Sequence, residues 1–232
     1  MTDEIFAYSP ARMIPLSDDQ QTRSFPIVTI AIIVVNALVF IGWQLRIGME
    51  DSLGIGAFIP AMLSHHDPGA TTRLITSLFM HGGWMHLIGN MWFLWIFGDN
   101  VEDACGPLRF FAFYLLCGVA ATLAHTWPAP DSTMPLVGAS GAISGVLGAY
   151  LLKHPRANVR TLIPLGFFTR IVDLPAWVFL LIWMGMQIFF EAVSGARGGG
   201  VAYLAHIGGF VAGMGLIVFF ERSPARAADG GT

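Results

Sequence analysis

The sequence predicts an all-α membrane protein with six transmembrane helices. Of its 232 residues, 55% are hydrophobic and 12% are charged, and that charged share is about half of what soluble domains carry. The charged residues also avoid six long apolar stretches. A helix that crosses a bilayer needs about 20 mainly apolar residues, because hydrocarbon cannot satisfy exposed backbone groups. Any one stretch could be a buried helix of a soluble domain, but six together favour a membrane protein.

The six predicted spans follow one another between polar connections. They are residues 25–45, 84–98, 110–127, 134–152, 174–190 and 201–220. Four of them approach spanning length alone, the uncharged segment 74–83 extends the second, and two apolar residues before the fifth extend that one. We therefore expect one membrane domain at residues 25–221, between a cytoplasmic N-terminal tail at 1–24 and a C-terminal tail at 222–232.

The distribution of Lys and Arg predicts the orientation of the spans, since cytoplasmic loops carry an excess of these residues. With the N-terminus in the cytoplasm, the inner segments hold nine of the twelve basic residues and the outer segments hold three. The connection at 154–170 is the strongest single contribution. The acidic start of the chain lacks the basic and then apolar pattern of a secretory signal. We expect a multi-pass protein of the cell membrane with both termini in the cytoplasm.

Polar residues inside the second, fourth and sixth predicted spans are the candidates for function, because buried polar groups are costly in a bilayer. His86 and Asn90 are four residues apart and share one face of the second span. Ser140 lies in the first turns of the fourth span, and His206 lies in the first turns of the sixth. These three spans run from outside to inside, so the four side chains are expected at one shallow depth below the outer surface.

Two glycine pairs give a reason for the fourth and sixth spans to touch. Gly141 and Gly145 form one small-xxx-small pair, and Gly209 and Gly213 form another. Such faces allow two helix backbones to approach closely. If the two faces meet, Ser140 is brought near His206.

A serine beside a histidine can act as a nucleophile, because the imidazole removes the hydroxyl proton. The tetrahedral intermediate then needs donors for its oxyanion, and the Ser140 backbone N–H, His86 and Asn90 are candidates. Asp and Glu are absent from the six spans near this level, so the site would be a Ser-His dyad. The hydrolase pattern G-x-S-x-G is excluded because Ala142 replaces its last glycine.

Each of these signals also has a structural explanation. A transmembrane serine usually bonds a carbonyl of its own helix, and His86 with Asn90 could be an interhelical hydrogen-bonded pair. A transporter lined by the histidines or a haem or metal protein would use the same residues, but acidic residues and metal-binding motifs are missing from the spans. The two cysteines, Cys105 and Cys117, are expected to be small packing residues.

Three motifs occur in order along the chain. They are His81-x4-His86-x3-Asn90 in the second span, Gly138-Ala139-Ser140-Gly141 in the fourth, and Ala205-His206-x2-Gly209 in the sixth. At these residues the chain resembles the rhomboid family of intramembrane serine proteases. Arg73 and the pair Val101-Glu102 also lie at family-like positions. The resemblance covers roughly residues 25–221 and implies a six-transmembrane-helix rhomboid-like bundle.

The resemblance implies that Ser140 is the nucleophile and His206 its general base. It also implies that His86 and Asn90 stabilise the oxyanion and that His81 supports the site and organises water. The first loop would lie partly in the outer leaflet, and the fifth span and the loop at 194–200 would act as lateral gate and cap. The chain departs from the family at Ser144, where many rhomboids have an aromatic residue, and at Thr72, where many have tryptophan.

The expected activity is that of a serine endopeptidase that cleaves the transmembrane segments of membrane proteins near their outer ends. A catalytically inactive rhomboid-like protein that binds membrane clients is the first alternative, and a multi-pass transporter is the second. The expected partners are transmembrane protein substrates and the lipid bilayer. The small net charge of −3 gives no sign of a nucleic-acid partner, and we expect no cofactor and no metal.

Overall fold

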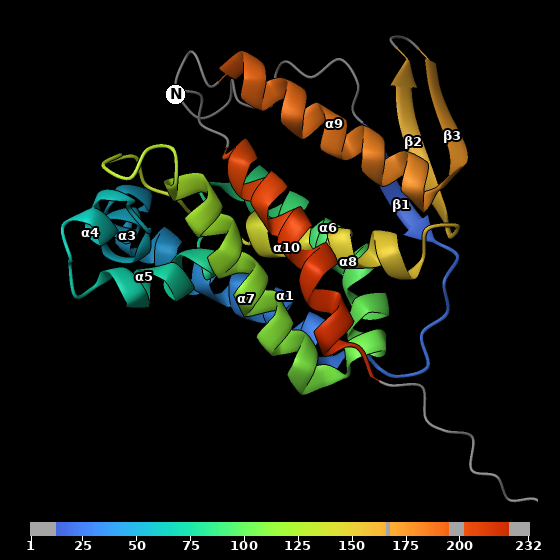
Figure 1. The fold of residues 1–232 in the computed structure, drawn as a ribbon, viewed down its shortest axis with the longest axis horizontal. Helices are drawn as coiled ribbons and strands as arrows, with labels where there is room; N and C mark the ends of the chain where they lie inside the picture. Colours follow the sequence, from blue (N-terminus) through green and yellow to red (C-terminus); the bar gives the residue numbers. More distant parts are fainter. Residues whose placement is uncertain (1–12, 166–167, 195–201, 223–232) are drawn as a thin grey trace, which may run out of the picture.

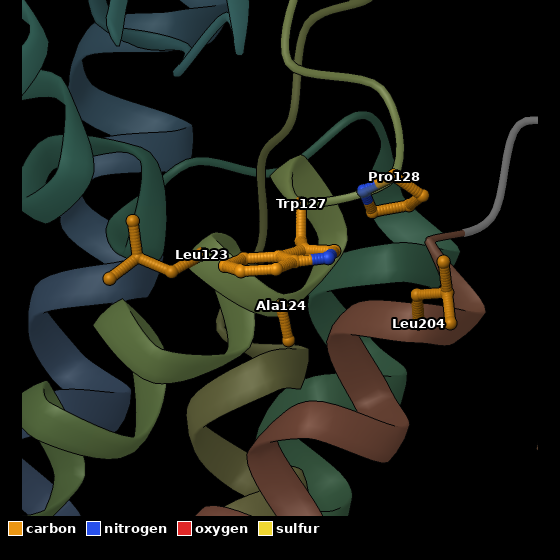
Figure 2. Close-up of a pocket in the computed structure, with 5 residues that line it drawn as sticks. All are labelled: Leu123, Ala124, Trp127, Pro128 and Leu204. Atoms are coloured by element: carbon orange, nitrogen blue, oxygen red, sulfur yellow. The ribbon is translucent and has the colours of Figure 1, made fainter.

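The computed structural model describes residues 13–165, 168–194 and 202–222, and in these ranges the chain is mostly helical (Figure 1). The long helices are α1 (Ile27–Val39), α6 (Trp84–Cys105), α7 (Pro107–Thr126), α8 (Ser140–Lys153), α9 (Ala176–Ser194) and α10 (Tyr203–Phe220). A π-helical turn, η1 (Phe40–Gln44), and the short α2 (Leu45–Ile47) continue α1.

Four segments are long and apolar enough to cross a membrane. They are Ile27–Ile47, Pro107–Thr126, Ala176–Val193 and Tyr203–Phe220. Of the remaining long helices, α8 has only 14 residues, and α6 has Asp99, Glu102 and Asp103 in its last turns. The protein is therefore a membrane protein with four candidate spans by length and composition, against the six predicted.

A three-stranded antiparallel sheet is the main difference from the all-α prediction. Its strands lie in the order β1 (Ile14–Asp18), β2 (Asn158–Leu165) and β3 (Phe168–Pro175). The sequence analysis assigned β1 to the N-terminal tail and β2 to a loop. It divided β3 between that loop and the start of the fifth span, which begins instead as a strand. Val159 and Thr161 are fully buried, whereas Arg160 between them is exposed. This is the alternation of a strand, and the prediction missed it because the basic residues there were read only as a charge signal.

The sheet is attached to the helices through Asp18 of β1. The Tyr150 hydroxyl of α8 donates to Asp18 Oδ2 at 2.5 Å, and Asn100 Nδ2 of α6 donates to the same oxygen at 2.9 Å. Burial raises the pKa of Asp18 above its usual value, although the hydrogen bond from Tyr150 acts in the opposite direction. The segment predicted as a tail therefore contributes an ordered strand that packs on the bundle.

The short helices of the first loop lie at the opposite end of the molecule from the sheet (Figure 1). They are α3 (Met49–Gly56), α4 (Ala61–Ser64), α5 (Ala70–Thr76) and the 3₁₀ turn η2 (Ser77–Phe79). Phe58 exchanges two backbone hydrogen bonds with Leu136, at 3.0 and 2.7 Å, and the Gly138 N–H donates to Ser77 at 2.9 Å. The first loop thus fixes the backbone that leads into α8.

The predicted contact between the glycine faces of α8 and α10 is confirmed. A Cβ atom at Gly209 would overlap the carbonyl of Gly141, and one at Gly213 would overlap the carbonyl of Gly145. Residues 141–150 of α8 are all buried, so α8 is the central helix. The close backbone approach aligns the first turns of α8 and α10.

Glu102 stabilises the start of α1 from α6, and its removal is expected to destabilise the fold. Its carboxylate accepts hydrogen bonds from the Val28 N–H at 2.9 Å, the Thr29 N–H at 2.7 Å and the Thr29 hydroxyl at 2.8 Å. Because these donors are otherwise unpaired at the helix start, Glu102→Ala should lower the free energy of unfolding by about 2 kcal/mol. Denaturant titration in detergent micelles, followed by circular dichroism, measures this loss.

Glu102→Gln keeps one carbonyl oxygen as an acceptor and should lose less stability than the alanine variant. Glu50→Ala, at an exposed position of α3, is the control and should leave the unfolding midpoint unchanged. Equal midpoints for Glu102→Ala and Glu50→Ala would show that the carboxylate does not hold α1.

Candidate active site

The hydroxyl of Ser140 and the imidazole of His206 are in hydrogen-bond contact. Ser140 is the first residue of α8, His206 lies in the first turn of α10, and Oγ is 2.9 Å from Nε2. The two residues are 66 positions apart in the chain and meet because the glycine faces below them pack closely. Both residues are only partly buried.

The second nitrogen of His206 contacts a residue that the sequence analysis did not select. Nδ1 lies 2.8 Å from Oε1 of Gln187 in α9. A carboxamide oxygen is only an acceptor, so this contact favours the tautomer with the proton on Nδ1 and the lone pair of Nε2 toward the Ser140 hydroxyl. Gln187 is the only carboxamide in the apolar stretch 174–190, and that isolation was the available signal.

His86 and Asn90 lie together beside the backbone that leads to Ser140. A Cβ atom at Gly138 would be 2.7 Å from Cε1 and Nε2 of His86 and 3.7 Å from Nδ2 of Asn90. Gly138 has φ +121°, a left-handed conformation that suits glycine. Only glycine therefore lets this backbone pass so close to the two side chains.

The donors of His86 and Asn90 are available for a further partner. The Gly82 N–H donates to His86 Nδ1 at 3.3 Å, which leaves the proton on Nε2, the atom beside Gly138. Asn90 is buried, and its Nδ2 has no hydrogen-bond partner among the described residues. A buried unpaired donor is unusual and calls for an explanation.

His81 lies behind this pair and is fully buried. Its ring centroid is 5.1 Å from that of His86, edge to face. Its backbone is held by Gln44, which accepts from the His81 N–H and donates to the His81 carbonyl, both at 3.0 Å. The two ring nitrogens have no partner in the part of the chain that the structure describes.

Comparison with known proteins decides the family. The model of the Rhomboid domain matches residues 68–223, which include α6 to α10 and the five site residues predicted from the sequence, His81, His86, Asn90, Ser140 and His206. This chain belongs to the rhomboid family. Its sequence is 32% identical to the rhomboid protease GluP of Bacillus subtilis over 82% of the chain and 34% of that relative.

Two further rhomboid relatives come from eukaryotic organelles. Rhomboid protein 1, mitochondrial, of Saccharomyces cerevisiae is 29% identical over 79% of this chain and 50% of that protein. Rhomboid-like protein 11, chloroplastic, of Arabidopsis thaliana is 28% identical over 74% of this chain and 60% of that protein. The chain thus spans between about a third and three fifths of the length of these relatives.

Ser144, at the position where many rhomboids have an aromatic residue, is satisfied within its own helix. Its hydroxyl donates to the carbonyl of Ser140 at 2.7 Å, and its side chain is buried. The aromatic rings near His206 come instead from Trp183 of α9, at 6.1 Å between centroids, and Tyr203 of α10, at 6.4 Å. In this rhomboid, α9 and α10 thus supply the aromatic surroundings of the imidazole.

Other predicted features differ in how far the structure describes them. The predicted cap at 194–200 lies almost wholly outside the described residues, as does most of the C-terminal tail. Within the described ranges, no group of three or more His, Cys, Asp or Glu side chains could hold a metal ion. Cys105 and Cys117 are both free and buried in the core.

Proposed function

We propose that this rhomboid is an intramembrane serine endopeptidase that cleaves the transmembrane segments of membrane proteins. Ser140 is the nucleophile and His206 is the general base. The observation that carries the proposal is the 2.9 Å contact between Ser140 Oγ and His206 Nε2, which is within the reach that proton transfer needs. The similarity to the rhomboid protease GluP supports it.

The reaction follows from the tautomer of the His206 imidazole in which Nε2 is free to accept a proton. Nε2 accepts the Ser140 proton while Oγ attacks the peptide carbonyl, and the imidazolium then gives that proton to the leaving amine. Water next enters, loses a proton to Nε2 and attacks the acyl-enzyme, and Ser140 leaves with its proton restored. Acylation and deacylation each return His206 to the neutral tautomer in which Nε2 is the acceptor.

Three donors would stabilise the oxyanion in this reaction. The Ser140 backbone N–H is at the start of α8, where helix N–H groups have no partner in the helix. Nε2 of His86 and Nδ2 of Asn90 lie beside Gly138, two residues before the nucleophile. An oxyanion would satisfy the unpaired Asn90 donor, which explains why that donor is buried. His81 supports His86 from behind and can hold a water molecule.

The short length of α8 indicates how the site is placed in the bilayer. At 14 residues and 1.5 Å per residue it is about 21 Å long, less than the ~30 Å hydrocarbon core. If α6 and α8 lie in the bilayer with the four candidate spans, the bundle has six membrane helices and Ser140 lies below the outer surface. The non-helical backbone before Ser140 is tolerated at that depth because it packs on the first loop.

The proposed orientation of the spans is the one that the distribution of Lys and Arg predicts. Both termini lie in the cytoplasm, and the site opens to the outer side of the cell membrane. A substrate helix must unwind locally near its outer end, because its carbonyls are hidden in helical hydrogen bonds. Helix-breaking residues near the cut should therefore favour cleavage.

Reconstitution of the full chain in liposomes with single-pass model substrates tests this function. We expect two products whose masses place the cut near the outer end of the substrate helix, and faster cleavage when a helix breaker is introduced there. Substrates that bind the reconstituted protein and stay intact would support the inactive, client-binding alternative.

Removal of either proposed oxyanion donor is expected to slow the chemical step. His86→Ala and Asn90→Ala should each lower kcat by about 10²- to 10³-fold with little change in KM, because the donors act mainly on the transition state. His65→Ala, at an exposed position of the first loop, is the control. Steady-state cleavage measures both constants; a rise in KM with unchanged kcat would place the two side chains in substrate binding instead.

A further inference from the structure

The imidazole of His206 is held from the side away from Ser140 by one face of α9. Trp183 and Gln187 are four residues apart, so they lie on the same face of that helix. The Trp183 ring is tilted by 33° to the imidazole at 6.1 Å between centroids, and Gln187 Oε1 is 2.8 Å from Nδ1. Both partly buried side chains are therefore in contact with the proposed general base.

The helix that carries Ser140 offers the imidazole no such support. Ser144 lies one turn after Ser140, and its hydroxyl is engaged by the Ser140 carbonyl at 2.7 Å. A serine side chain is also too small to pack against the ring from that position. Beyond the Ser140 hydroxyl itself, the side chains that hold the His206 ring on its other side therefore come from α9 and not from α8.

We propose that Gln187 is a positioning residue that fixes the tautomer and the ring orientation of His206. The proposal rests on the function proposed above for His206. A neutral imidazole exchanges its proton between two nitrogens, and only the form with the proton on Nδ1 leaves Nε2 free to accept the Ser140 proton. With the carboxamide oriented as in the structure, Gln187 Oε1 accepts a hydrogen bond from Nδ1–H and donates none, which favours that form.

The way in which α9 is attached makes the hydrogen bond between Gln187 and His206 sensitive to the position of that helix. The start of α9 is pinned by backbone hydrogen bonds from Ala176 to Ala157, at 2.8 Å, and from Trp177 to Pro155, at 3.0 Å. Among the described residues, the bond from His206 to Gln187 is the one side-chain hydrogen bond that α9 makes with another element. Movement of the outer half of α9 away from α10 would break it and release the imidazole.

The test replaces Gln187 with residues of similar length. Gln187→Met keeps the bulk and loses the acceptor, so kcat should fall by about 100-fold with KM nearly unchanged. Gln187→Glu retains an acceptor at the same reach and should recover most of that loss. Ile188→Met, at the exposed neighbouring position, is the matched control and should behave as wild type.

A spectroscopic measurement separates this proposal from the proposed function. In ¹⁵N-histidine NMR of the full chain in micelles, His206, identified by comparison with His206→Ala, should show a protonated Nδ1 in wild type and Gln187→Glu. Gln187→Met should show a mixture of tautomers. Unchanged tautomers and unchanged kcat in Gln187→Met would overturn the positioning role even if the protein is a protease. A tautomer shift in a protein that cleaves nothing would uphold the contact while refuting the protease.

Discussion

Replacing Ser140 with alanine is expected to reduce cleavage of a transmembrane substrate by roughly 10⁴-fold or more, because no nucleophile remains to form the acyl-enzyme. His206→Ala should reduce it as strongly, since the hydroxyl at 2.9 Å from Nε2 then has no base. The two residues act in one step, so the double variant should be no slower than either single variant. Initial rates in liposomes measure all three.

Ser144→Ala is the matched control for the nucleophile, because Ser144 is a second serine one turn further along the same helix. Its hydroxyl bonds the Ser140 carbonyl and has no role in the proposed reaction, so this variant should keep an activity within a few-fold of wild type. An active Ser140→Ala together with an inactive Ser144→Ala would move the nucleophile to the second serine.

The second large effect is expected from a single methyl group in the contact between α8 and α10. A Cβ atom at Gly213 would overlap the carbonyl oxygen, the carbonyl carbon and the Cα atom of Gly145. These are backbone atoms of the central helix, so they cannot move independently of it. Gly213→Ala should therefore force the two helices apart and lower the free energy of unfolding by roughly 3 kcal/mol. Because the first turns of these helices carry Ser140 and His206, proteolytic activity should fall as well.

Gly215→Ala is the control for this variant, two residues further along α10. A Cβ atom at Gly215 would meet no atom within 4 Å, so alanine there should be neutral or slightly stabilising, since it favours the helix over glycine. Thermal unfolding in micelles compares the two variants. Equal midpoints would show that the close approach of the backbones does not hold α8 against α10.

The proximity of Ser140 and His206 could be predicted from the sequence because it depends on local patterns. The apolar stretches define helices, alternate helices run in the same direction, and the glycine pairs identify the faces that meet. The pairing of Gly209 with Gly141 in the structure is what these patterns predict. The placement of His86 and Asn90 beside Gly138 agrees with the same argument about depth.

Features that depend on contacts between distant segments could not be predicted in this way. β1 is formed by five residues of the predicted tail and pairs with β2, so no local run of residues reveals it. Four of the six predicted spans meet the length and composition criteria in the structure, and the other two stay a prediction, since α8 is short and α6 carries acidic residues. Gln187 was missed because a lone carboxamide in an apolar helix gains meaning only when its neighbour is known.

The most direct test is whether a fluorophosphonate probe labels Ser140 in the full chain. An activated serine displaces fluoride from phosphorus and forms a stable phosphonate ester, while an ordinary serine does not react. We expect mass spectrometry to place one adduct on Ser140 in wild type and to find none in Ser140→Ala or His206→Ala. Labelling of Ser140 that is undiminished in His206→Ala, or no labelling of well-folded wild type, would contradict the proposed Ser-His dyad.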